Sequence, residues 1–169
     1  FGVRIAEGYG LTETSPVTNW CLPSEWRHRS VGRPLPDVQE RIVAPDGRVL
    51  PAGEDGEVRI KGPNVMHGYW NLPEKTAEAH RGAYLSVGDM ALRDSDGFIR
   101  LIDRKKNMII SGGENISSIE VEDALYRHPA VLACAVVAKP DDKWGETPLA
   151  FVELHAGHVG DAESLKAHC

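Results

Sequence analysis

The stretch IDRKKNMIISGGENI, residues 102–116, places three consecutive cations, Arg104-Lys105-Lys106, directly before an apolar run and a pair of glycines. Cationic side chains of this kind bind phosphate groups, and glycines let a backbone approach a ligand closely. Three kinds of site fit the pattern: a nucleic-acid patch, a loop that cradles phosphate, or a nucleotide site at the junction of two domains. These residues alone leave all three open.

Two further segments carry residues that could bind a nucleotide. The segment EGYGLTETSP combines the flexible Gly8-Tyr9-Gly10 with Thr12 and Glu13. A hydroxyl can bond a phosphate oxygen, and a carboxylate can hold Mg²⁺. Asp89 in YLSVGDMA follows a glycine, where a carboxylate could take both hydroxyls of a ribose. Taken singly, each segment is also explained by a plain turn.

The charge balance argues against a nucleic-acid-binding protein. The 169 residues carry a formal net charge of −6 at pH 7, whereas domains that bind nucleic acid usually show clustered Lys and Arg. The run Arg104-Lys105-Lys106 is the only compact basic run, and Asp103 offsets one of its charges. We therefore expect no nucleic-acid partner.

The composition is that of a globular protein, with 41% hydrophobic residues. The longest uninterrupted apolar run, which contains Val131–Ala138, is far shorter than the ~20 residues that span a bilayer, so we expect no transmembrane segment. Three scattered cysteines, Cys21, Cys134 and Cys169, indicate neither a disulfide framework nor a zinc site. These features predict a cytoplasmic protein with reduced thiols.

The first two thirds of the chain have the pattern of short strands joined by turns. Asp46-Gly47 and Asp96-Gly97 each separate two alternating segments, which is a hairpin signal. The segment EVRIK, residues 57–61, alternates apolar and charged side chains and predicts a half-buried strand.

After Gly113 the pattern becomes that of an α/β region. Ser117 with Glu120 three residues later predicts a capped helix. The continuous apolar run that follows predicts a strand buried on both faces, and LAFVELH, residues 149–155, predicts a second strand. Asp161 is the expected N-cap of another helix.

These patterns predict a mixed α/β fold made of parts of two domains. Residues 1–105 are expected to form β-hairpins and strands. Residues 106–169 are expected to form an α/β region that is cut short inside an element.

Four ordered segments resemble successive core motifs of the adenylate-forming (AMP-binding) superfamily. They are GYGLTE (8–13), GEDGEVRIKGPNVMHGYW (53–70), YLSVGD (84–89) and DRKKNMIISGGENISSIEVE (103–122). Any one of them is a weak signal, whereas four in this order at compatible spacing are highly specific and cover nearly the whole chain. The superfamily includes the acyl-CoA synthetases, the luciferases and the adenylation domains of peptide synthetases.

The resemblance implies the third kind of site, a nucleotide site at a domain junction. It implies that Gly8-Tyr9-Gly10 lies against the adenine, that Thr12 contacts the α-phosphate and that Glu13 is associated with Mg²⁺. Asp89 matches the acid that binds the ribose hydroxyls, and Arg104 matches the basic residue that also reaches the ribose.

The resemblance also implies that residues 1–105 are the end of a large N-terminal domain and that residues 106–169 are the start of a small α/β C-terminal domain, which is truncated. It implies that this C-terminal domain rotates between two steps of a reaction. Lys106 matches the hinge of that rotation. Ser111, Gly112 and Gly113 match the loop that lines the pantetheine tunnel of CoA, and Trp144 lies either near the CoA path or at a turn as a packing aromatic.

The motifs around the hinge look like those of acyl-CoA synthetases that use aliphatic or small aryl acids, which implies a role in fatty acid metabolism. The implied reaction converts a carboxylic acid, ATP and CoA into acyl-CoA, AMP and pyrophosphate through an acyl-adenylate, with Mg²⁺ as cofactor. The alternatives are another adenylate-forming ligase and a non-catalytic nucleotide-binding or interaction remnant.

The chain departs from the family pattern in two places and lacks two of its motifs. Val87 stands where the family commonly has Thr, and Asn107 stands where it commonly has Asp. The family's phosphate loop and its C-terminal lysine, which serve adenylation, are not among the 169 residues. We therefore expect this chain, as an internal fragment, to be inactive alone.

Overall fold

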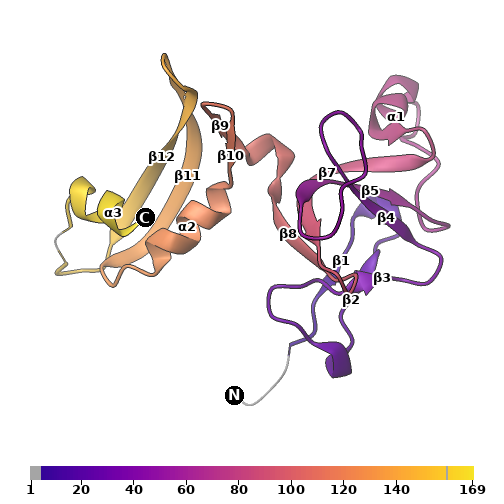
Figure 1. Ribbon diagram of the computed structural model, residues 1–169, viewed down its shortest axis with the longest axis horizontal. Coiled ribbons are helices and arrows are strands. Elements are labelled where there is room, and N and C mark those ends of the chain that lie inside the picture. The colour runs from indigo at the N-terminus through magenta and orange to yellow at the C-terminus, as the bar shows by residue number, and fades with distance from the viewer. Residues whose placement is uncertain (1–4, 159) are drawn as a thin grey trace. The chain divides into compact units, whose positions relative to one another are not determined.

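The structure is a computed structural model that describes residues 5–158 and 160–169 (Figure 1). The chain forms two compact units, one ending at Leu101 and the other beginning at Ile102. The expected boundary between residues 105 and 106 falls in the 3-10 turn η3 (Lys105–Asn107), inside the second unit. The expected mixed α/β fold is confirmed, with strands predominating in both units and short helices beside them.

The first unit contains two antiparallel sheets. The smaller sheet has the order β1-β2-β3, with β1 (Gly8–Tyr9), β2 (Asn19–Trp20) and β3 (Arg33–Pro34). The 3-10 turns η1 (Thr12–Thr14) and η2 (Pro23–Glu25) lie between its strands. The larger sheet has the order β4-β5-β7-β6, with β8 also paired to β7. Its strands are β4 (Gln39–Val43), β5 (Asp55–Lys61), β6 (His80–Arg81), β7 (Tyr84–Arg93) and β8 (Ile99–Arg104). The boundary between the two units falls inside β8, so its residues 102–104 belong to the second unit.

Strand β5 lies between β4 and β7 and carries the core of the first unit. Val58 and Ile60 on this strand are fully buried, and Ile42 and Ile99 belong to the same cluster. Arg59, between the two buried residues, is only half-buried. The alternation predicted for residues 57–61 is therefore confirmed, and each buried aliphatic side chain contributes ~1.5–3 kcal/mol of hydrophobic stabilisation.

Both predicted hairpin turns are present. In the Asp-Gly turn after β4, Gly47 has a φ of +88° and its N–H donates to the Ala44 carbonyl at 2.9 Å. In the turn between β7 and β8, Asp94 Oδ1 accepts from the backbone N–H groups of Asp96 and Phe98, each at 2.9 Å. A side chain that closes its own turn in this way is typical of Asp in such loops.

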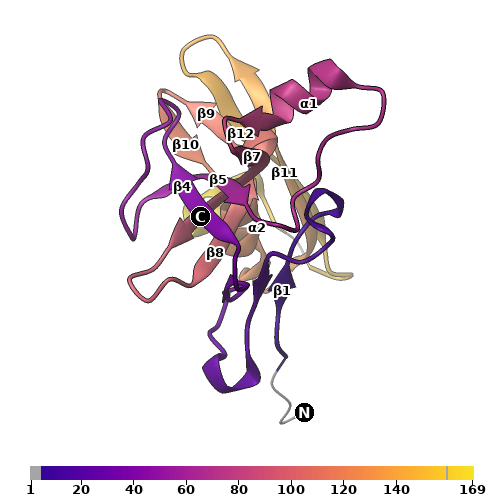
Figure 2. The same cartoon turned by 90° about the vertical axis from the view of Figure 1, so that its right-hand side faces the viewer.

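Helix α1 (Pro73–Ala79) lies in a stretch that was expected to contain only strands and turns. That expectation is wrong, although the sequence held a usable signal. Pro73 occupies the first turn of the helix with Glu74 beside it, and both are helix-start residues. Figure 2 shows α1 at one end of the first unit and β1 toward the other.

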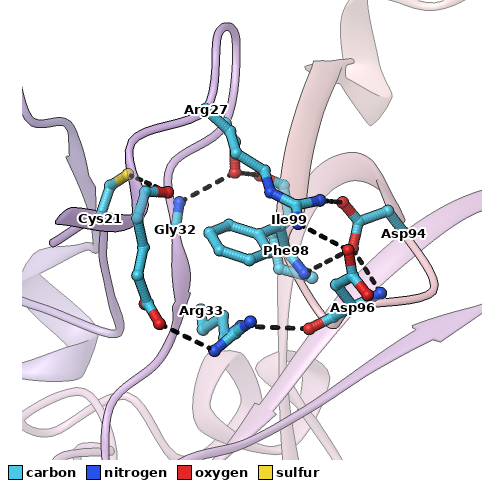
Figure 3. A network of polar contacts seen from close by, with 10 residues as sticks. Cys21, Arg27, Gly32, Arg33, Asp94, Asp96, Phe98 and Ile99 are labelled. Carbon is cyan, nitrogen blue, oxygen red and sulfur yellow. Dashed lines mark hydrogen bonds and ion pairs between the residues drawn. The ribbon is translucent and has the colours of Figure 1, made fainter. Parts of the chain in front are cut away.

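Arg27, in the loop between β2 and β3, holds the turn between β7 and β8. Its guanidinium donates to Asp94 Oδ2 at 2.7 Å and to Asp96 Oδ2 at 2.5 Å. The same group lies 4.1 Å from the ring centroid of Phe98, and Arg33 lies 4.4 Å from that centroid. Figure 3 shows the Phe98 ring between the two guanidinium groups. The loop is thereby fixed to a turn that is distant from it in sequence.

The second unit is a four-stranded antiparallel sheet with two helices. The strand order is β10-β9-β12-β11, with β9 (Ile109–Ser111), β10 (Glu114–Ile116), β11 (Val131–Asp141) and β12 (Gly145–Leu154). Helix α2 (Ser118–Tyr126) packs on β11, and α3 (Ala162–His168) lies next to α2 (Figure 1). Within the described part of the chain, no helix is long and apolar enough to cross a membrane.

Both predicted helix caps of the second unit are confirmed. Ser117 Oγ accepts from the N–H of Glu120 at 3.3 Å, and Asp161 Oδ1 accepts from the N–H of Ser164 at 2.7 Å. Each bond satisfies a backbone donor that the first turn of the helix leaves without an internal acceptor.

Strand β11 differs from the expected strand buried on both faces. Val131 and Val136 are buried, whereas Leu132 is 48% exposed and Val137 is 46% exposed. The side chain of Val136 belongs to the cluster beneath α2, so helix packing covers one face of the strand. An apolar run of strand length does not by itself report how many of its faces are covered.

Glu40 is a buried carboxyl group that links the two sheets of the first unit. Asn19 Nδ2 on β2 donates to Glu40 Oε2 on β4 at 3.0 Å. Among the residues that the structure describes, Glu40 Oε1 has no hydrogen-bond donor. Burial raises the pKa of Glu40 from 4.5 to about 7, against the opposing effects of the Asn19 hydrogen bond and the positive charge of Arg93.

This raised pKa predicts a pH-dependent stability that Glu40→Gln should remove. The folded state holds the proton more tightly than the unfolded state, so the wild-type free energy of unfolding falls as pH rises from 4.5 toward 7. The amide does not titrate. We expect Glu40→Gln to be near neutral below about pH 4 and stabilising by up to ~3 kcal/mol at about pH 8.

Urea denaturation across this pH range measures the difference. Glu78→Gln, an exposed position on α1, is the matched control because it removes the same charge. Equal pH dependence in the two variants would show that the Glu40 carboxyl is not held neutral in the folded protein.

Candidate functional site

Two predicted nucleotide-site residues of the first unit meet directly. Tyr9 lies on β1 and Asp89 on β7, and the Tyr9 hydroxyl donates to Asp89 Oδ2 at 2.5 Å across 80 sequence positions. Asp89 is only 5% exposed. A hydrogen bond to a carboxylate shielded from water is strong and directional. It therefore fixes the relative orientation of the two side chains.

The backbone of Tyr9 is fixed by the neighbouring strand segment. The N–H of Thr18 donates to the Tyr9 carbonyl at 2.8 Å, and Tyr9 pairs with Asn19 in the β1–β2 ladder. Thr18 and Asn19 are fully buried. The tyrosine is thus held at its backbone by β2 and at its hydroxyl by β7.

The loop after Tyr9 requires glycine at position 10 for a reason within the fold. A Cβ on Gly10 would lie 1.7 Å from the Pro16 carbonyl oxygen and 2.7 Å from Val17 Cα. Only glycine permits two backbone segments to pass at this distance. The neighbouring predicted residues Gly8, on β1, and Thr12, in η1, are exposed.

Glu13 lies in η1, and Tyr69 holds its carboxylate. The Tyr69 hydroxyl donates to Glu13 Oε1 at 2.8 Å, and the N–H of Met66 donates to the Glu13 carbonyl at 2.9 Å. The hydrogen bond to Glu13 raises the pKa of Tyr69, and partial burial adds to the effect. The phenol therefore stays protonated and remains a donor to the carboxylate.

The predicted residues Arg104 and Lys106 lie in the second unit. Arg104 is the last residue of β8, and Lys106 is in η3. Both are exposed. The N–H of Met108 donates to the Arg104 carbonyl at 3.2 Å. The three consecutive cations are thus wound into a single turn at the end of a strand.

Asp103, directly before these cations, is a buried residue to which the sequence analysis gave no structural role. Its Oδ2 accepts from Ser118 N at 3.0 Å, from Ser118 Oγ at 2.9 Å and from Ser117 Oγ at 3.1 Å. Its Oδ1 accepts from the N–H of Arg104 at 2.6 Å. Asp103 therefore ties the end of β8 to the N-terminus of α2, where the helix dipole favours negative charge.

The predicted CoA-binding segment Ser111-Gly112-Gly113 forms the turn between β9 and β10. Gly112 has a φ of +59° and Gly113 a φ of +92°, as a two-residue hairpin turn requires. A Cβ on Gly112 would lie 2.7 Å from the ring of Trp144, and the N–H of Gly112 donates to the Trp144 carbonyl at 2.8 Å. The glycine pair thus has a structural role in this turn, and Trp144 packs against it.

In the first unit, the structure joins Tyr9 to Asp89 and adds one residue that sequence reasoning missed. That residue is Tyr69, which lies in the segment 53–70 but was given no role. Its bond to Glu13 joins positions 56 residues apart. No local pattern carries a signal for such a contact.

Two family models match the chain: the AMP-binding enzyme over residues 1–70 and the AMP-binding enzyme C-terminal domain over residues 120–169. The chain belongs to the AMP-binding enzyme family. The division of the matches between two models agrees with the two compact units of the structure.

Individual AMP-binding enzymes are similar over nearly the whole chain. The chain is 44% identical to a feruloyl-CoA synthase from an Amycolatopsis species, over 98% of the chain and 34% of that protein. It resembles the o-succinylbenzoate CoA synthetase from Bacillus subtilis in complex with the acyl-adenylate intermediate OSB-AMP, with a TM-score of 0.88, 37% identity, and coverage of 99% of the chain and 34% of that structure. It also resembles the amide bond synthetase McbA from Marinactinospora thermotolerans, with a TM-score of 0.84, 38% identity, and coverage of 96% and 34%. The chain thus spans about a third of the length of these relatives.

The contacts of Asp103 predict that the stability of helix α2 depends on the negative charge of this residue. Burial raises the pKa of Asp103, but hydrogen bonds from Ser118, from the backbone of Arg104 and Ile119 and from Ser117 outweigh it, so the pKa is lowered. A lowered folded pKa contributes stability above the unfolded pKa that is lost as pH falls through the folded value. We expect Asp103→Asn to destabilise α2 by about 2 kcal/mol at neutral pH and by less in acid.

Native-state hydrogen exchange of the α2 amides measures this loss directly. Asp142→Asn, in the exposed loop between β11 and β12, removes the same charge and serves as the control. If both variants exchange at the wild-type rate, the carboxylate of Asp103 does not stabilise the helix.

Proposed function

We propose that the protein to which this chain belongs is an ATP-dependent acyl-CoA synthetase. It would activate a carboxylic acid as an acyl-adenylate with release of pyrophosphate, and then transfer the acyl group to CoA with release of AMP. The observation that carries the proposal is the hydrogen bond between Tyr9 and Asp89, because it joins the proposed adenine segment to the proposed ribose-binding acid. Similarity to relatives named as CoA synthetases supports it.

The proposed nucleoside contacts follow from the family motifs. Gly8-Tyr9-Gly10 would lie against the adenine, Asp89 would accept from the ribose hydroxyls, and Arg104 would also reach the ribose. A buried, charged acceptor with a fixed rotamer suits a neutral diol, since the donors and acceptors are complementary.

The proposed phosphate contacts are Thr12 for the α-phosphate and Glu13 for Mg²⁺. Within residues 5–158 and 160–169, no group of three His, Cys, Asp or Glu side chains could hold a metal by itself. Magnesium at nucleotide sites usually takes one or two carboxylates together with waters and substrate phosphates. The Glu13 carboxylate fits that donor set, and bound Mg²⁺ would offset the charge that develops as pyrophosphate leaves.

The second half-reaction needs a different arrangement of groups, because the thiol of CoA must reach the acyl-adenylate. We propose that Ser111, Gly112 and Gly113 line the path of the pantetheine arm and that Lys106 is the hinge of the C-terminal domain. Hinges work by large dihedral changes at a few residues at the ends of elements, and η3 follows the end of β8.

Another adenylate-forming ligase is the second candidate, favoured by the similarity to an amide bond synthetase. The two differ in the acceptor of the acyl group, CoA in one and an amine in the other, so an acceptor panel separates them. A non-catalytic remnant would show neither activity.

We propose the cytoplasm as the compartment, which is supported by the three cysteines being free thiols. Aliphatic or aryl acid substrates would place the enzyme in fatty acid or related acid metabolism.

The ribose assignment predicts the behaviour of Asp89→Ala in the full-length enzyme. The variant loses charge-assisted hydrogen bonds to the ribose, so we expect ATP affinity to fall at least about tenfold. Tyr9→Phe removes the Tyr9–Asp89 bond but keeps the carboxylate, so its loss of ATP affinity should be smaller than that of Asp89→Ala. An unchanged affinity for ATP in Asp89→Ala would contradict the assignment.

The hinge assignment predicts a selective effect of Lys106→Pro in the full-length enzyme. Proline fixes φ near −65° and restricts the residue before it, so the dihedral change of the rotation is blocked. We expect adenylation to survive and thioester formation to fall at least about tenfold, a barrier increase of ~1.4 kcal/mol.

The two half-reactions are measured separately, by pyrophosphate exchange and by conversion of preformed acyl-adenylate with CoA. Lys106→Ala removes the charge but leaves the dihedral free, and should slow the second step much less. Equal slowing of both steps by the proline variant would exclude Lys106 as the hinge.

A further inference from the structure

Tyr69 lies in the loop between β5 and α1, and its hydroxyl donates to Glu13 Oε1 at 2.8 Å. We infer that Tyr69 is a positioning residue that holds the Glu13 carboxylate in the orientation in which it meets Mg²⁺ on the phosphates of ATP. The inference rests on the proposed function and deepens it, since it assigns a role to a residue outside the motif that carries Glu13.

The loop that carries Tyr69 also fixes the backbone of η1. The N–H of Met66 donates to the Glu13 carbonyl at 2.9 Å, and Asn64 Nδ2 donates to the Thr14 carbonyl at 3.0 Å. With its backbone held by these two bonds, Glu13 retains chiefly its side-chain torsions. The phenol hydroxyl of Tyr69 restricts those torsions, because it engages one of the two carboxylate oxygens.

Tyr69 is itself fixed against helix α1. The backbone N–H of Tyr69 donates to Thr76 Oγ1 at 2.9 Å. The Thr76 hydroxyl in turn donates to the Leu72 carbonyl at 2.9 Å. Gly68 lets the chain approach the helix, since a Cβ there would lie 2.5 Å from Thr76 Cγ2. The backbone from which the phenol extends is thus held by the helix.

The chemistry of the contact suits a metal-binding carboxylate. A carboxylate has two oxygens, so a donor at Oε1 leaves Oε2 for the metal. The phenol is neutral and leaves the negative charge of Glu13 in place. Hydrogen-bond donors to metal-ligating groups orient those groups, and their loss typically lowers metal affinity about 10- to 100-fold.

The test compares Tyr69→Phe with Tyr84→Phe in the full-length enzyme. Each variant deletes one phenol hydroxyl from the first unit and keeps the ring. The Tyr84 hydroxyl donates to Gln39 Oε1 at 3.0 Å, at an exposed contact outside the proposed site. Calorimetric titration with ATP, without the acid substrate, is carried out once with Mg²⁺ and once with EDTA.

We expect Tyr69→Phe to weaken ATP binding about tenfold in Mg²⁺ and to leave binding in EDTA within about twofold of wild type. Tyr84→Phe should match wild type in both conditions. In pyrophosphate exchange, the Mg²⁺ concentration for half-maximal rate should rise about tenfold in Tyr69→Phe, with the rate at saturating Mg²⁺ restored to within about twofold.

The outcomes separate this inference from the proposed function. If wild type binds ATP more tightly in Mg²⁺ and Glu13→Gln removes that gain, but Tyr69→Phe behaves as Tyr84→Phe does, the role of Tyr69 is wrong and the proposed function stands. Equal weakening of Tyr69→Phe in Mg²⁺ and in EDTA also overturns the inference, because it shows a general structural role. A wild-type enzyme without Mg²⁺-dependent ATP binding overturns both.

Discussion

The hydrogen bond from Tyr9 to Asp89 is the contact on which the site of the first unit depends, because it joins the smaller sheet to the larger one. Each of the two residues is held by further contacts within its own sheet. Thr18 holds the Tyr9 backbone, and β7 pairs with β5, whose Val58 and Ile60 are fully buried. A charged group shielded from water is stable only with strong polar contacts. The same hydrogen bond therefore joins the two sheets and fixes the position of the proposed ribose acid.

Two other buried carboxyl groups show that the number of hydrogen-bond donors decides whether the pKa of a buried carboxyl group is raised or lowered. Glu40 receives an amide hydrogen bond from Asn19, and burial dominates, so its pKa rises to about 7. Asp103 receives hydrogen bonds from two serines and from backbone N–H groups, and they outweigh burial, so its pKa is lowered. Both residues are buried. Exposure alone therefore does not determine the charge state of a carboxyl group in this fold, whereas the local donor set does.

The features that the sequence predicted correctly have local causes. The Asp-Gly turns and the caps at Ser117 and Asp161 act over two to four residues, so their patterns can be recognised without the fold. The exposure of Leu132 and Val137 depends on which elements cover β11, and the apolar run holds no such information. Helix α1 also has a local cause, because Pro73 in its first turn is a helix-start residue that the sequence already contains. The residue roles in the candidate site came from resemblance to a family, and the contacts of Tyr9 and Tyr69 with their carboxylates became visible only in three dimensions.

Some residues that the family motifs connect to ligands also have a reason within the fold. Gly10 is required by the Pro16 backbone, and Gly112 by its positive φ and by the Trp144 ring. The presence of these glycines is therefore explained by the fold without a ligand. Asp89 and Glu13 differ from them, because each accepts from a tyrosine hydroxyl supplied by a distant segment. Arg or Lys at either tyrosine position would orient the carboxylate but offset its charge. A neutral phenol orients the carboxylate and preserves the charge that a ribose diol or a magnesium ion would bind.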